Sequence, residues 1–174
     1  MDLRNKADSP GKKPQACLIV KPPAIEIRPA NSADAKPIAH LSGQLGYPTA
    51  SRQAESRLDA ILGAEDHAVF VAHADQQILG WIHVFLARRI ESEPFAELGG
   101  LVVAASHRRR GIGRHLLARA EEWSIGCGVA KLRVRVRSSR DEARTFYQNL
   151  GFTLQKEQGV FDKSWQTRRR DCSL

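Results

Sequence analysis

The spacing of apolar and polar positions along the chain predicts an alternation of strands and helices. Helices are expected to begin near Asp34, Ser51, Gly113 and Asp141, because apolar residues recur at helical spacing after each of these positions. Short stretches that alternate apolar and polar residues, or that run apolar throughout, predict strands. Those stretches are residues 24–30, 67–74, 78–89, 95–106 and 130–138, with a closing hairpin over 152–165.

The predicted order of these elements is βααβββαβαβ, with one further strand expected at the end. The late βαβα alternation indicates parallel pairing, whereas the hairpins in the middle of the chain indicate antiparallel pairing. We therefore expect an α/β fold in one domain, with a mixed sheet of six to seven strands flanked by about four helices. The domain is expected to span residues 24–166, between a flexible leader at 1–23 and a flexible basic tail at 167–174.

Composition narrows the class of protein. The chain has 174 residues, 42% of them hydrophobic, which suits one globular domain with a core. Its formal net charge of +8 indicates an anionic partner, and nucleic acid, a membrane surface or a phosphorylated cofactor would each satisfy it. No apolar run approaches the ~18 residues of a membrane span, and the N-terminal residues lack the apolar core of a signal peptide, so we expect a cytoplasmic protein.

Cysteine and histidine usage argues against a disulfide framework and against a metal site. Cys17, Cys127 and Cys172 lie far apart and are odd in number, so we interpret them as free thiols. The six histidines are scattered, and none has the spacing of a zinc site. We therefore expect no bound metal.

The stretch "HRRRGIGRHLL", residues 107–117, joins a predicted strand to a predicted helix. Gly111 and Gly113 allow the backbone to approach a ligand, and the N-terminus of the helix offers free N–H groups to an anion. Four side chains add donors around it: Arg108, Arg109, Arg110 and Arg114. The glycine pattern is neither G-x-G-x-x-G nor a Walker A loop, so we expect a phosphate cradle of another kind. The alternative is a helix cap that happens to lie beside surface arginines.

The stretch "AELGGLVVAASHRRRGIGRHLLARAEEW" resembles the acetyl-CoA-binding core of the GNAT superfamily of N-acetyltransferases. Arg108, Gly111 and Gly113 occupy the positions of that family's R/Q-x-x-G-x-G/A loop. The later stretch "DEARTFYQNLGF" resembles the family's A-x-x-x-Y-x-x-x-G-F helix, which includes Tyr147. The resemblance covers residues 25 to about 165. It departs from the family at Arg140, where many members carry Asn, although an arginine there could still reach a phosphate.

The resemblance implies acetyl-CoA as the cofactor, with coenzyme A as product. Its pyrophosphate is expected on the amides of residues 109–114, which include Ile112, and its pantetheine arm along Leu101, Val102 and Val103. That arm requires the strand to separate from its neighbour, which a bulge at Gly99-Gly100 would favour.

Acetyl transfer to an amine requires a neutral amine, a polarised carbonyl and a proton for the leaving thiolate. The resemblance implies that Tyr147 is the proton donor, although its position beside Phe146 is also compatible with core packing. Glu97 lies in an otherwise apolar strand and matches a position where some family members carry a base. Glu97 could act directly or through water, or it could instead face outward and pair with an arginine.

The acceptor side is less defined by the sequence. Tyr47 follows the first helix, where relatives shape the acceptor pocket, and His83 shares a strand face with Trp81 and Phe85. The basic positions of "KLRVRVR" (Lys131, Arg133, Arg135 and Arg137) suggest a solvated face, an acceptor groove, a subunit contact or a cofactor contact. We expect an N-acetyltransferase acting on a small-molecule or peptide amine, without a membrane or specific nucleic-acid partner, and with homodimerisation as a possibility. The alternatives are a basic nucleic-acid-binding module and a cofactor sensor without catalysis.

Overall fold

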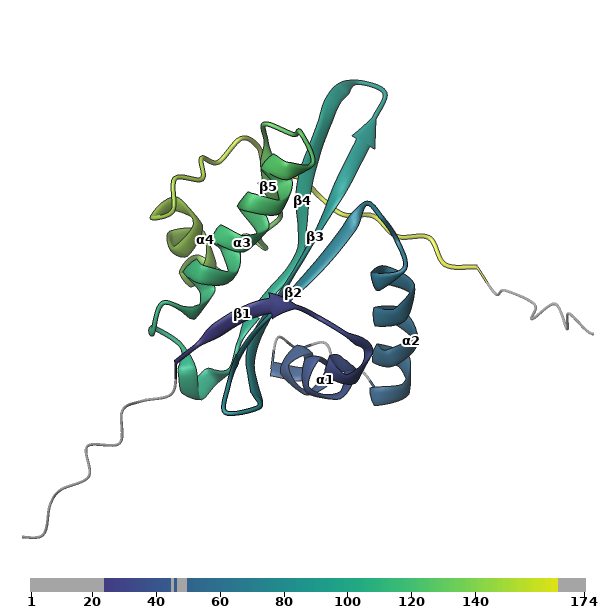
Figure 1. Cartoon of the computed structure of the whole chain (residues 1–174). Helices are drawn as coiled ribbons and strands as arrows, with labels where there is room; N and C mark the ends of the chain where they lie inside the picture. The colour runs from purple at the N-terminus through teal and green to yellow at the C-terminus, as the bar shows by residue number, and fades with distance from the viewer. Residues whose placement is uncertain (1–23, 45, 47–49, 166–174) are drawn as a thin grey trace, which may run out of the picture.

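A computed structural model describes residues 24–44, 46 and 50–165. Within these residues the chain forms one five-stranded sheet in the order β1-β2-β3-β4-β5 (Figure 1). The strands are β1 (Glu26–Pro29), β2 (His67–Ala74), β3 (Gln77–Arg89), β4 (Ser92–Val103) and β5 (Leu132–Val134). The first four strands pair antiparallel, and β5 pairs parallel to β4. The sheet is therefore mixed, as the sequence predicts.

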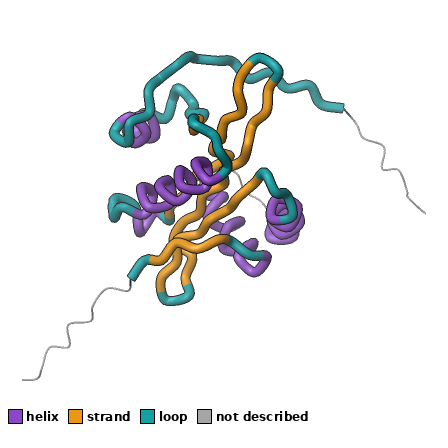
Figure 2. The backbone as a smooth tube through the Cα atoms, turned by 45° about the horizontal axis from the view of Figure 1, so that its top comes forward, coloured by secondary structure: helices purple, strands orange, loops and turns teal. Residues whose placement is uncertain are grey.

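Two pairs of helices cover the two faces of the sheet (Figures 1 and 2). The helices α1 (Ala35–Gln44) and α2 (Ser51–Leu62) pack on one face, where α1 contacts β3 and β4 and α2 contacts β2. The helix α3 (Ile112–Gly126) crosses the other face and contacts β2, β3 and β4. On that second face α4 (Asp141–Gln148) adds Phe146 and Tyr147 to the core. Two short 3-10 helices, Ser32–Asp34 and Ala105–His107, precede α1 and α3.

The larger part of the core lies between the sheet and α3. Ile82 and Val84 of β3 are fully buried there against Leu116 and Leu117 of α3. The opposite face carries smaller clusters, in which Leu58 of α2 packs on Val69 and Leu41 of α1 packs on Val102. The unequal packing leaves space between α1, α2 and the sheet, and this space is where the pocket described below lies.

The structure confirms the predicted fold class and the element order as far as α4. The strand count differs, because residues 152–165 form no strand, so the described chain has five strands instead of six or seven. Phe152 packs against the core, but the later apolar residues of this segment, such as Val160 and Phe161, are exposed and interrupted by charged residues, so they offer no continuous face to bury. The strand predicted over 130–138 is also shorter, since only Leu132–Val134 pair with β4.

The remaining predictions concern single residues and short segments. α2 begins at Ser51 as expected, but the cap position is Ala50, which makes no side-chain cap hydrogen bond. The predicted leader at 1–23, Tyr47 and the tail at 167–174 lie outside the described residues, so those predictions remain as stated. In the described part of the chain no helix has both the length and the apolar character needed to cross a membrane.

Candidate active site

The strands β4 and β5 separate after a short parallel contact. Only Ala96, Glu97 and Leu98 of β4 pair with β5, whereas β4 continues along β3 as far as Val103. The register between β3 and β4 shifts where His83 opposes Gly100 and Val84 opposes Leu98, which leaves Gly99 as the extra residue of a β-bulge. The bulge predicted at Gly99-Gly100 is thus present, and the strands part beyond it.

The separation leaves an edge of β4 that β5 does not pair. Beyond the bulge Ala104 donates its N–H to the Leu79 carbonyl on the β3 side, at 2.8 Å. Because successive residues of a strand face opposite neighbours, Val103 and Leu101 present their backbone groups to the open side. These are the two residues at which a pantetheine arm is expected to pair. Between them, Val102 is buried and packs near Leu41, so its side chain belongs to the α1 face.

The two glycines of the bulge also make room for aromatic rings from β3. A Cβ on Gly99 would collide with His83 Nδ1, and a Cβ on Gly100 would lie 2.7 Å from Trp81 Cη2. The rings of Trp81 and His83 therefore lie over β4 at the point where β4 and β5 part. This close approach is a second reason for the glycine pair that the sequence analysis did not anticipate.

The cradle predicted at residues 108–114 forms the start of α3. Gly111 is the N-cap residue in a left-handed conformation, with φ of +81°, and Arg109 also has a positive φ of 61°. The first helical hydrogen bond runs from His115 N–H to the Gly111 carbonyl at 3.1 Å, so the N–H groups before His115 have no helical acceptor. Gly113 allows the helix to pack closely, because a Cβ there would lie 3.2 Å from Phe146 Cζ. The loop therefore combines free donors with the positive end of a helix dipole.

The arginines around the cradle lie in different environments. Arg108 folds back and donates through Nε to the Val103 carbonyl at 3.3 Å, which links the cradle to the open edge of β4. Arg109, Arg110 and Arg114 are exposed. Ile112 is buried in the core, so only its backbone is available to a ligand. Arg140 precedes α4 as its N-cap residue and is exposed.

Tyr147 lies in the core beneath α3. Its side chain makes edge-to-face contacts with Phe146 and Phe152, at centroid distances of 5.1 and 5.3 Å. Burial raises the pKa of Tyr147 to about 12. The phenol therefore keeps its proton at neutral pH, as a proton donor must, while its ring takes part in core packing. The two interpretations of Tyr147 made from the sequence are compatible with each other.

Glu97 is buried and ion-paired. Its Oε1 lies 2.7 Å from Arg135 Nε, and its Oε2 lies 3.8 Å from an Arg89 nitrogen. The guanidinium of Arg133 lies 4.0 Å from the centre of the neighbouring Phe95 ring. Arg133 and Arg135 thus contact side chains of β4, so the basic stretch that includes β5 is not simply a solvated surface. Pairing with an arginine is the alternative that the sequence analysis left open for Glu97.

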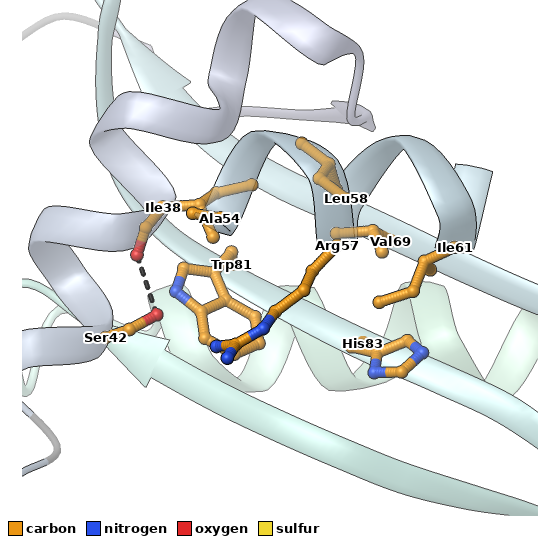
Figure 3. Close-up of a pocket in the computed structure, with 9 residues that line it drawn as sticks. All are labelled: Ile38, Ser42, Ala54, Arg57, Leu58, Ile61, Val69, Trp81 and His83. Atoms are coloured by element: carbon orange, nitrogen blue, oxygen red, sulfur yellow. Dashed lines mark hydrogen bonds between the residues drawn. The ribbon is translucent and has the colours of Figure 1, made fainter. Parts of the chain in front are cut away.

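A pocket lies between α1, α2 and the sheet, at the side of the bulge (Figure 3). Its volume is about 170 Å³. The wall is mostly apolar, with Trp81 and His83 from β3 and Arg57 from α2 as its polar or aromatic members. The buried Nε1 of Trp81 has no hydrogen-bond partner, whereas Ser42 donates its hydroxyl to the Ile38 carbonyl at 2.8 Å. The remaining lining residues are Ala54, Leu58, Ile61 and Val69.

The described lining of this pocket contains one cation and no carboxylate. Arg57 extends from α2 toward Trp81 (Figure 3). Arg57 was not predictable as a pocket residue from the sequence. A charged residue on the exposed face of a helix has the same sequence pattern whether it contacts a ligand or only solvent. Among the described residues no cluster of histidine, cysteine, aspartate and glutamate could hold a metal ion.

These features define a class of protein in which a mixed sheet opens between β4 and the edge strand β5, beside an anion cradle. The chain belongs to the acetyltransferase (GNAT) family, whose model matches residues 36–152. It is therefore an acyltransferase, an N-acetyltransferase that uses acetyl-CoA. The family and cofactor expected from the sequence are confirmed.

Similar proteins are named as acetyltransferases of aminoglycosides or of streptothricin. The chain is 30% identical over 134 residues to an aminoglycoside N(6')-acetyltransferase type 1 of Stenotrophomonas maltophilia, covering 74% of this chain and 86% of the relative. It is 28% identical over 119 residues to a streptothricin acetyltransferase of Escherichia coli, covering 66% of each chain. Among solved structures, an aminoglycoside N-acetyltransferase in complex with CoA matches with a TM-score of 0.74 at 23% identity, covering 84% of this chain and 99% of the other.

Proposed function

We propose that the protein transfers the acetyl group of acetyl-CoA to the primary amine of a small molecule that has an apolar body and a carboxylate. The observation that carries the acceptor class is the pocket beside the bulge. Its walls are mostly apolar, and its charged member is Arg57. A carboxylate would pair with the Arg57 guanidinium, whereas a polycation meets a like charge and finds no acidic partner in the described lining.

The residues present fit the cofactor. The free N–H groups from Arg109 to Arg114 would hold the pyrophosphate, and the unpaired edge at Leu101 and Val103 would pair with the pantetheine arm. When bound, acetyl-CoA supplies an activated acetyl thioester. The arginines around the cradle would add charge-assisted hydrogen bonds, with Arg140 contributing from the start of α4.

Tyr147 is the proposed donor of the proton that the leaving sulfur needs. Its raised pKa keeps that proton on Oη at working pH. Glu97 is the base proposed from the sequence, acting through water. The Arg135 guanidinium contacts the Glu97 carboxylate, so Glu97 also holds Arg135 against β4.

The volume of the pocket supports a small acceptor. A pocket of about 170 Å³ is below the ~300–1,000 Å³ that hold drug-sized ligands. An aliphatic amino acid combines an amine, a carboxylate and an apolar side chain in about that size. The antibiotics named for the relatives are the competing acceptors.

The acceptor class is tested with L-leucine, its amide and kanamycin as acceptors. We expect acetylation of L-leucine to exceed that of kanamycin in kcat/KM, measured by thiol release. Arg57→Ala should lower kcat/KM for L-leucine by about tenfold, because a charge-assisted contact is lost, and should change the value for L-leucinamide by less than about twofold.

Arg52→Ala is the matched control, since Arg52 is an exposed arginine of the same helix that does not line the pocket. Arg52→Ala should leave kcat/KM unchanged for both L-leucine and L-leucinamide. Preferred turnover of kanamycin, with no effect of Arg57→Ala on any acceptor, would contradict a carboxylate-bearing acceptor.

A further inference from the structure

Two histidine rings from neighbouring strands join end to end beside the bulge. His67 Nδ1 of β2 lies 2.9 Å from His83 Nε2 of β3. The ring centroids are 5.2 Å apart and the planes differ by 16°, so the rings meet through their nitrogen edges in nearly one plane. Phe85 packs against both rings, at centroid distances of 5.3 and 5.6 Å, and fixes their orientation. This geometry suits proton transfer from one ring to the other.

The pair connects the interior of the site to its surface. At the inner end His83 lines the pocket, and its Nδ1 is the ring atom nearest to Gly99 of the bulge. At the outer end His67 Nε2 lies 3.7 Å from Asp66 Oδ1. Asp66 is partly exposed and also pairs with Arg88 at 3.3 Å. A proton could therefore pass from the pocket through the two histidines, and from His67 through water to solvent or to Asp66.

We propose that His83 and His67 form a proton relay that deprotonates the acceptor amine. This inference rests on the proposed function, because it assigns the amine to the pocket beside the bulge. His83 Nδ1 takes a proton from the ammonium group, His83 Nε2 gives its proton to His67 Nδ1, and His67 Nε2 releases its proton to Asp66 or water. The amine leaves this sequence neutral with its lone pair free, and both rings end with one proton each.

The groups around His83 favour a neutral ring. Burial, together with the charge of His67, lowers the pKa of His83 to about 4, so its lone pair is available at neutral pH. Arg57 of α2 is the cation that faces it across the pocket, and α1 contributes only the uncharged Ile38 and Ser42. On β4 the acidic group of the same face, Glu97, is held by Arg135.

The relay predicts a definite tautomer, which can be read without substrate. In the full-length ¹⁵N-labelled chain at pH 7, His83 should carry its proton on Nε2 and none on Nδ1, as judged from long-range ¹H–¹⁵N correlations. His67 should carry its proton on Nε2. His83→Gln and His67→Gln spectra assign the signals. A proton on His83 Nδ1 in the free protein would overturn the relay, because that nitrogen could not then receive one.

The kinetic test uses L-leucine and L-leucinamide as probes. His83→Gln should lower kcat/KM by about a hundredfold at pH 7, because the amine must then lose its proton to water before it reacts. This deficit should shrink as the pH rises, with the rate of the variant increasing about tenfold per pH unit below the pKa of the amine. His67→Gln should show the same trend. The affinity for acetyl-CoA, measured by calorimetry, should stay within about twofold in both variants.

His73→Gln is the matched control. His73 is a part-buried histidine of β2 that lies 3.5 Å from Glu26 and does not line the pocket, so its removal should leave the pH profile unchanged. Glu97→Gln tests Glu97 as the competing base, because a steep rise of the rate with pH should appear in this variant if Glu97, rather than His83, deprotonates the amine. A pH profile of His83→Gln parallel to the wild type, or a steep profile only in Glu97→Gln, would overturn the relay while leaving acetyl transfer intact. If the wild type binds acetyl-CoA and acetylates neither probe, the proposed acceptor fails, and the tautomers then decide for or against the relay.

Discussion

Tyr147, the proposed proton donor, also packs in the core. Its ring lies between Phe146 and Phe152, and the same burial keeps its phenol protonated. Tyr147→Phe preserves the ring and removes the proton. We expect kcat to fall by about a hundredfold, with the KM for acetyl-CoA within about twofold of the wild type. The melting temperature should stay nearly the same, and a variant with unchanged turnover would remove Tyr147 as the proton donor.

His83 makes stability depend on pH. Its pKa of about 4 in the folded chain lies below the usual value of 6.5, so the unfolded chain binds more protons between these values. The stability that follows from a neutral His83 is complete above about pH 6.5 and is lost as the pH falls toward 4. The loss at pH 4.5 should be about 2 kcal/mol. Urea unfolding at pH 7 and 4.5 measures it.

His83→Gln removes the titrating group, so its free energy of unfolding should vary less with pH than that of the wild type. His73→Gln again serves as the control and should retain the wild-type dependence. An equal pH dependence in the wild type and His83→Gln would show that His83 is not held neutral.

At the level of elements, the proposed cofactor site lies at the start of α3 and the bulge of β4. Gly111→Asp places a carboxylate among the N–H groups of the cradle, so the Kd for acetyl-CoA should rise by at least about tenfold. Gly111 has a φ of +81°, so the substitution also costs stability, of order 1 kcal/mol. Isothermal calorimetry measures the affinity.

Gly128→Asp is the control that separates the effect of a charge at the cradle from the effect of backbone strain. Gly128 has a φ of +76° just beyond the opposite end of α3, and a Cβ there meets nothing within 4 Å. It should lose a similar amount of stability and keep the affinity for acetyl-CoA. Equal loss of affinity in both variants would mean that backbone strain, rather than charge at the cradle, weakens binding.

Elements with their own periodic pattern were predictable from the sequence. The strands β2 and β3 and the helices α1 to α4 agree with the prediction, because apolar spacing alone sets which face each one buries.

The register between strands was not predictable in the same way. The turn at Asp75-Gln76 pairs Ala74 with Gln77, but a bulge between Ala72 and His73 shifts the remaining pairs by one residue. That shift determines which residues oppose His67 and His83, so their contact could not be read from the hairpin turn.

At the scale of the whole molecule, the sheet separates two sites. The cradle and the unpaired edge of β4 would hold the cofactor at the end of the sheet where α3 begins (Figure 1). The pocket lies on the face of the sheet that α1 and α2 cover, which is opposite to the face that α3 covers (Figure 3). The bulge at Gly99 belongs to both, since β4 parts from β5 there and His83 of the pocket lies over it. The fold thus brings the two reactants together at one strand.

Binding of acetyl-CoA should stabilise the whole chain, because the cradle and the open strand edge exist only when it is folded. At about one hundred times the Kd, the stabilisation is about 2.7 kcal/mol, which corresponds to a rise in Tm of roughly 5–10 °C. Differential scanning fluorimetry measures the shift, with adenosine as a ligand that lacks the pyrophosphate. No shift at millimolar acetyl-CoA would contradict the assigned site.

The class of fold was predictable from the sequence because it depends on apolar periodicity, and the family was predictable from the resemblance of two motifs, including Gly111 and Gly113. The tertiary structure decided how the polar groups meet. It paired Glu97 with Arg135, placed Arg57 beside Trp81, and brought His67 to His83. These contacts join different strands and helices, and they depend on strand register and helix packing. No local pattern encodes those two properties, so the chemistry of the acceptor side emerges only once the chain is folded.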